Sequence, residues 1–82
     1  MDLSHRLKTL GRALDKFSPN DPVPWQTAVV FNALLGEAKK QHGSDPVISV
    51  IEPVTGDGEY ANESAGSMRA LVGQIYEAAA GR

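Results

Sequence analysis

Apolar residues near the start of the chain recur at alternating intervals of four and three positions. This spacing places them on one narrow stripe of an α-helix, so we expect a helix from about Leu3 to Phe17. Asp2 or Ser4 can cap its N-terminus. Because the stripe covers only two heptads, it predicts one wall of a compact bundle and not a free-standing coiled coil. The stripe consists of Leu3, Leu7, Leu10, Leu14 and Phe17.

Three prolines between residues 18 and 24 interrupt this helical pattern, because proline removes a backbone donor and restricts the residue before it. Asp21-Pro22 has the form of an N-cap followed by proline at the first helical position. We therefore expect a second helix that begins at Pro22 or Pro24 and runs to His42, with Gly43 as a left-handed stop.

The first half of this second helix is apolar in nearly every direction at the helical period. A helix of this kind is buried on several sides, yet an 82-residue chain has few other elements to cover it. Either the other helices cover it completely or part of its surface meets a second molecule, and we predict the second outcome. The predicted protein interface consists of Trp25, Val29, Val30, Phe31 and Leu34.

Residues 44–53 allow two interpretations. The β-branched composition of Val47–Ile51 is typical of a buried strand, but a lone strand would need a symmetry mate as its partner. Asp45-Pro46 repeats the cap-then-proline start, and a helix would place four apolar residues on one face. We favour a short helix that ends before Pro53, with an extended segment as the alternative. The four residues are Val47, Val50, Ile51 and Val54.

The C-terminal third begins with a turn and ends in a helix. Asp57-Gly58 is the strongest turn signal in the chain. A final helix is expected from Asn62 or Ser64 to about Ala80, with a strip of small residues (Gly66, Ala70 and Gly73) beside its apolar face. The whole pattern predicts one all-α domain over residues 1–82. It would be a small bundle of three long helices plus one short helix or extended segment at about residues 46–52.

Composition narrows the function classes. The chain has no cysteine, which excludes disulfides, thiolate metal sites and cysteine nucleophiles within this sequence. No stretch approaches the 18 apolar residues of a membrane span, and the charged start MDLSHRLKTL lacks the apolar core of a signal peptide. We therefore expect a cytoplasmic protein that does not enter a membrane.

Charge is divided unevenly along the chain. Residues 1–42 carry six Lys/Arg and four Asp/Glu (+2), whereas residues 43–82 carry two and six (−4). On the first helix, His5 and three cations form one basic stripe that can contact an acidic partner. The alternative is a solvated face opposite the leucine stripe, and this interpretation is favoured. The three cations are Lys8, Arg12 and Lys16.

Motifs for chemistry are absent from the sequence. His5 and His42 lack the partner at three or four positions that a helical metal site needs. The acidic loop around Asp57 does not follow the ligand spacing of an EF-hand, and no Gly-Lys-Ser/Thr cradle for phosphate is present. We therefore expect no catalytic residue, no metal and no cofactor.

Two further side chains have alternative roles. Trp25 is a residue type that is enriched at binding hot spots, but in a small core it more often anchors helix packing. Asn32 lies among apolar neighbours, where it is either a buried, hydrogen-bonded amide or a marker that fixes the register of an interface.

These observations favour a small helical protein-interaction or oligomerisation module without catalytic activity. Its expected partner is a second copy of the chain or another protein. The first alternative is a small nucleic-acid-binding protein that uses the basic face of the first helix, although a net charge of −2 argues against it. The second alternative is a regulatory subunit of an enzyme.

Overall fold

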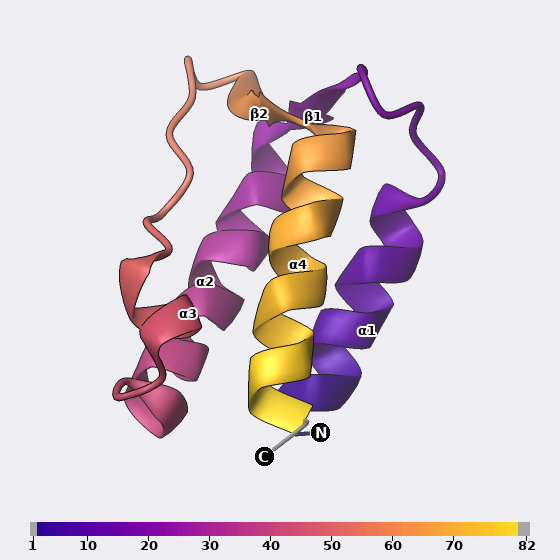
Figure 1. Cartoon of the computed structure of the whole chain (residues 1–82). Helices are drawn as coiled ribbons and strands as arrows, with labels where there is room; N and C mark the ends of the chain where they lie inside the picture. Colours follow the sequence, from indigo (N-terminus) through magenta and orange to yellow (C-terminus); the bar gives the residue numbers. More distant parts are fainter. Residues whose placement is uncertain (1, 81–82) are drawn as a thin grey trace.

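The computed structural model describes residues 2–80, which are mostly helical, as the sequence predicts. The all-α prediction is nevertheless wrong in one respect, because a two-stranded antiparallel sheet is also present. Figure 1 shows the arrangement, with α4 in the centre, α1 on one side of it, and α2 and α3 on the other. In chain order the elements are α1 (Leu3–Leu14), β1 (Pro22–Pro24), α2 (Trp25–His42), α3 (Pro46–Val50), β2 (Tyr60–Ser64) and α4 (Ala65–Ala80).

Helix α1 begins where the sequence predicts. The carboxylate of its N-cap, Asp2, accepts the backbone N–H of His5 at 2.8 Å. The helix ends at Leu14, three residues before the predicted Phe17, because the chain tightens into a turn there. Phe17 still packs against the core from this turn. The four leucines of the stripe are all buried, as a wall of a bundle requires: Leu3, Leu7, Leu10 and Leu14.

The segment before α2 is a strand and not the start of a helix. Pro22 pairs with Ser64 and Pro24 with Tyr60, and a bulge lies between the two pairs. The predicted N-cap is therefore wrong. The carboxylate of Asp21 accepts the backbone N–H of Ser18 at 2.9 Å and so stabilises the preceding turn. With prolines at both ends of β1, its ladder is short, and proline is tolerated because each strand of a two-stranded sheet is an edge.

Helix α2 starts at Trp25, whose backbone N–H donates to the carbonyl of Glu59 at 2.9 Å, next to the ribbon formed by β1 and β2. It ends at His42 as expected, with Lys39 and Lys40 in its last turn. Gly43, however, has a φ of −63°, so the predicted left-handed stop is wrong.

The ambiguous segment forms the favoured short helix, α3. The carboxylate of its N-cap, Asp45, accepts the N–H of Val47 at 2.8 Å, and Pro46 opens the helix. The predicted buried face is only partly correct, because Val47 and Val50 are exposed. The helix ends at Val50 and the next residue is already extended, so a longer helical face never forms. The residues that turn inward are Ile48, Ile51 and Val54.

The Asp57-Gly58 turn forms as predicted, with Gly58 at a φ of +96°, where a side chain would be strained. The carboxylate of Asp57 accepts the backbone N–H groups of Tyr60 and Glu59, which lowers its pKa below the ordinary 3.8. Helix α4 follows β2 directly, and the hydroxyl of Ser64 accepts the N–H of Ser67 at 3.2 Å as a helix cap.

The β1–β2 ribbon determines how the long helices run. Helices α2 and α4 both leave the ribbon and descend side by side, whereas α1 runs in the opposite direction (Figure 1). Buried side chains from all four helices and both strands form one cluster between them. Its largest fully buried members are Phe31, Leu7, Leu14, Leu35, Ile48, Met68, Ile75 and Val23.

Candidate interaction surfaces

The structure gives the five predicted interface residues of α2 three different environments. Phe31 is fully buried and Leu34 is 4% exposed, so neither offers a free surface. Val29 and Val30 are each 49% exposed. One side of this apolar helix therefore faces the core, while Val29 and Val30 face solvent.

Val29 and Val30 lie along a groove between α1 and α2 of about 640 Å³. We call it the apolar groove. Leu10 and Leu34, which belong to the buried core, also line it. Ala13 and Ala33 extend its apolar surface, and Arg6 is the one charged side chain among its lining residues. The groove thus combines an exposed apolar ridge with an apolar depression.

Trp25, the fifth predicted interface residue, takes the core role. Its side chain is half-buried and packs against the core cluster. A Cβ placed on Gly56 would lie 2.8 Å from the Trp25 ring, so the glycine allows the loop to cross the indole closely. The tryptophan therefore joins the 51–60 segment to α2.

Asn32 is a hydrogen-bonded amide within the fold. Its Nδ2 donates to the carbonyl of Val54 at 3.0 Å, and its Oδ1 accepts the N–H of the same residue at 2.8 Å. This pair of bonds satisfies both backbone groups of Val54, next to the bond that Thr55 accepts from the N–H of Asn62. The residue thus fixes the position of the 51–60 segment against α2.

The predicted basic stripe is exposed but does not form one site. Lys8 and Arg12 line a groove of about 320 Å³ between α1 and α4, whereas Lys16 does not. Arg69 of α4 lies across this groove and supplies a third cation, and the half-buried Tyr76 also lines it. We call it the basic groove.

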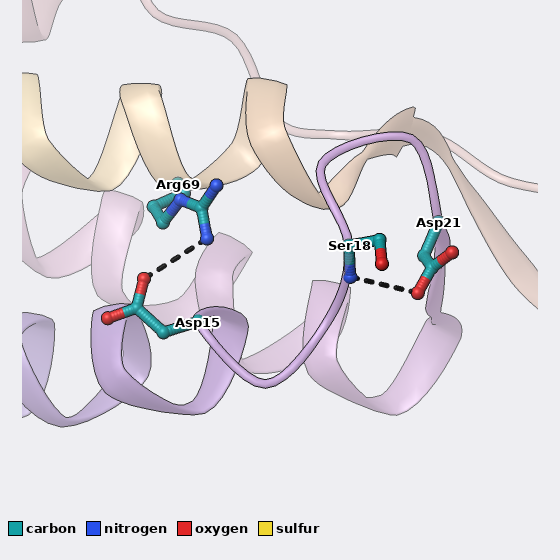
Figure 2. A network of polar contacts seen from close by, with 4 residues as sticks. All are labelled: Asp15, Ser18, Asp21 and Arg69. Carbon is teal, nitrogen blue, oxygen red and sulfur yellow. Dashed lines mark hydrogen bonds and ion pairs between the residues drawn. The ribbon is translucent and has the colours of Figure 1, made fainter.

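Asp15 gives the basic groove its one carboxylate. Its Oδ1 lies 3.1 Å from the Nη1 of Arg69, and Figure 2 shows this ion pair beside the turn that holds Ser18 and Asp21. The sequence pattern missed Arg69 because 54 positions separate it from Asp15, and only the packing of α4 on α1 brings them together.

A third groove, of about 460 Å³, runs along the other flank of α4 against residues 50–55. Glu52 and Glu63 both line it, together with the polar side chains of Asn62 and Gln74. No lysine or arginine is among its lining residues. We call it the acidic groove, and the sequence pattern did not predict it.

His5 and Asp57 have separate surroundings and do not share a site. His5 is exposed at the start of α1, and the carboxylate of Asp57 bonds to the backbone of its own turn. Among residues 2–80, no three His, Asp or Glu side chains are placed to hold a metal ion.

No helix within residues 2–80 is long and apolar enough to cross a membrane. Comparison with protein-family models, with curated proteins and with solved structures gives no match.

Proposed function

We propose that this chain is a small helical interaction module without catalytic activity, and that it self-associates through the apolar groove. The observation that carries the proposal is the position of Val29 and Val30. Both are half-exposed, and both border a depression lined by Leu10 and Leu34. Exposed apolar side chains beside a depression are typical of protein contact sites.

A second copy suits the groove because one chain carries both complementary shapes. The ridge of Val29 and Val30 can enter the groove of its mate while the mate's ridge enters in return, which is the isologous contact of a two-fold dimer. Burying this surface gains roughly 25 cal/mol for each Å² of apolar area removed from water.

The groove alone does not supply a full interface. A stable dimer buries about 800 Å² on each partner, which is about a sixth of the chain's 4926 Å² surface. The contact must therefore extend over the polar rim, where Arg6, Thr9 and Gln26 lie. This rim provides hydrogen-bond donors and acceptors around an apolar centre, the usual anatomy of a protein interface.

The test is the molar mass of the chain in solution. Sedimentation equilibrium at about 0.5 M NaCl, where exposed charges are screened, should show a mass that rises from 8.8 kDa towards twice that value between a few and a few hundred micromolar. At the same salt concentration, replacing Val29 and Val30 together by serine should restore the monomer while leaving the helical circular dichroism unchanged.

The matched control is Val47→Ser, because Val47 is an exposed valine that does not line the apolar groove. This variant should associate like the parent chain. A clean 8.8 kDa monomer at every concentration would overturn the proposal. Equal association of the Val29/Val30 variant and the parent would show that the contact lies elsewhere.

A further inference from the structure

Helix α4 has grooves of opposite charge along its two flanks. The basic groove holds Lys8, Arg12 and Arg69, with Asp15 paired to the last of these. The acidic groove holds Glu52 and Glu63. Residues 41–68 contain no lysine or arginine, so the chain around the acidic groove supplies no cation of its own.

The helical period places both grooves beside one exposed ridge. Val72 and Tyr76 of α4 line the basic groove, whereas Leu71 and Gln74 line the acidic groove. Ala70 and Glu77 are exposed between these two flanks, next to Gly73 at the edge of the basic groove. Figure 1 shows the same arrangement, with α1 on one side of α4 and the segment after α3 on the other.

Within one copy the two grooves cannot neutralise each other, because α4 stands between them. Two copies that face each other across their α4 ridges can. A two-fold axis parallel to α4 exchanges the left and right flanks, so each basic groove then faces the acidic groove of the mate. A two-fold axis across α4, in the plane of the contact, would instead set basic groove against basic groove.

We propose that two copies of the chain pair face to face across α4, about a two-fold axis parallel to this helix, with the basic groove of each against the acidic groove of the other. Ala70 has a short side chain and Gly73 has none, so the two α4 helices can approach closely. Gly73 has no neighbour within 4 Å of a Cβ position, so space is open above it. Glu77 is the one repulsive contact in this arrangement. It lies near the two-fold axis, so it faces Glu77 of the mate.

This contact is electrostatic and therefore weak and sensitive to salt. Exposed ion pairs are individually small, and charges are screened beyond about 10 Å at 0.1 M ionic strength. Several pairs must act together, and the two-fold axis doubles each of them. The contact is independent of the apolar groove, which lies on the opposite flank of α1 and is lined by Arg6 and Ala13.

The experiment uses two charge-reversed variants of the full chain. One carries Lys8→Glu with Arg12→Glu, and the other carries Glu52→Lys with Glu63→Lys. Both are made on the Val29→Ser/Val30→Ser background, which removes the apolar ridge. Asp57 and Asp15 are left unchanged, because their carboxylates hold a turn and an ion pair. Thermal melts establish that each variant is folded.

On this background, the chain with unreversed grooves should dimerise at low salt. Its dissociation constant should rise by about tenfold or more between about 0.05 and about 0.5 M NaCl, because screening shortens the reach of each charge. Each reversed variant alone should stay monomeric. Their equimolar mixture should form a heterodimer, because reversing both grooves in opposite senses restores two attractive contacts.

Three results would overturn the proposal. The first is a mixture of folded variants that stays monomeric, and the second is association of each variant alone at the parent's strength. The third is salt-dependent binding of a DNA duplex that Lys8→Glu with Arg12→Glu removes, in a chain that does not pair. That result would assign the basic groove to nucleic acid.

Glu77→Gln tests the orientation separately. It removes like charges that meet near the axis, so it should tighten the proposed dimer several-fold. A head-to-tail contact would leave Glu77 apart from its copy, and an unchanged dissociation constant would overturn the two-fold arrangement. Salt-dependent pairing that survives the valine substitutions supports this contact even if the parent chain shows no apolar association, so the two proposals fail separately.

Discussion

Helices α1 and α2 are both rich in apolar side chains, but only α1 of these two buries all of its large apolar residues. The leucine stripe of α1 is narrow and faces α4 and α2, with exposures of 5% or less. Helix α2 contacts the other three helices and the ribbon, and still leaves Val29 and Val30 at 49% exposure. The number of apolar residues on a helix therefore does not determine how much of it is covered.

The difference lies in how closely each apolar pattern matches the neighbours available. A narrow stripe needs one partner surface, and α4 and α2 together supply it for α1. A ring of apolar residues needs partners on every side, and the other three helices and the ribbon do not cover α2 completely. The valines that stay exposed on α2 are the surface that we propose for association between chains.

Leu7→Ala is the strongest test of the conclusion that the leucine stripe of α1 is buried. Leu7 is fully buried, so truncation should lower the free energy of unfolding by about 2–5 kcal/mol through lost burial and a residual cavity. Urea unfolding followed by circular dichroism measures this loss. Val30→Ala is the comparison on α2 and should cost far less. A loss below about 1 kcal/mol at Leu7 would contradict the buried stripe.

Asn32 is the polar residue on the covered side of α2, and its truncation should have the next largest effect. Asn32→Ala removes both bonds to Val54 and leaves that backbone unpaired, so stability should fall by about 1–3 kcal/mol. Asn62→Ala is the matched control, because its amide bonds the exposed hydroxyl of Thr55. If both variants lose the same free energy of unfolding, the two bonds of Asn32 contribute no more to stability than an exposed side-chain hydrogen bond.

Glycine-to-alanine substitutions extend the comparison of α1 and α2, because they test how much room each helix has for an added Cβ. Gly36 of α2 has no neighbour within 4 Å of a Cβ position, so Gly36→Ala should raise stability by about 0.5–1 kcal/mol. Gly11 of α1 would meet Val72 at an ordinary 3.7 Å and should gain a similar amount. Gly56→Ala should instead destabilise, since its Cβ would collide with the Tyr60 carbonyl. Thermal melts of the three variants measure these changes in stability and show whether only the Gly56 variant is destabilised.

The exposed half of the comparison predicts the smallest change in stability. Val30→Ser should alter the free energy of unfolding by no more than about 0.5 kcal/mol when measured on dilute, monomeric protein. Helix propensities of the two residues are similar, and the side chain already faces solvent. A loss above about 1 kcal/mol in the monomer would show that the ridge supports the fold itself.

Local signals in the sequence predicted most of the helices. Asp2 and Asp45 each have the side chain that satisfies a free helix N–H, and both cap as expected. The β1–β2 ribbon could not be predicted, because Pro22–Pro24 has no strand pattern and pairs with a distant segment. Its proline at position 22 is equally suited to a helix start, and long-range pairing decided between the two.

The candidate surfaces were predicted in part for a similar reason. The apolar pattern indicated that Val29 and Val30 belong to a helix that is apolar on nearly every side. It could not show that Phe31 and Leu34 face inward while the two valines face solvent. The basic and acidic grooves each combine residues from segments far apart in the chain, such as Lys8 with Arg69. Such combinations depend on how the helices pack, which no local pattern records.

The β1–β2 ribbon also restricts where the fold can open transiently. Strands β1 and β2 hold the first residues of α2 and α4 together, and backbone bonds from Ala65 to Asp21 and from Gly66 to Pro19 reinforce this end. Within residues 2–80, no strand pairing joins the opposite ends of the two helices (Figure 1). We therefore expect transient opening to start at the His42 end of α2. Amide hydrogen exchange along α2 and α4 should slow progressively towards the ribbon.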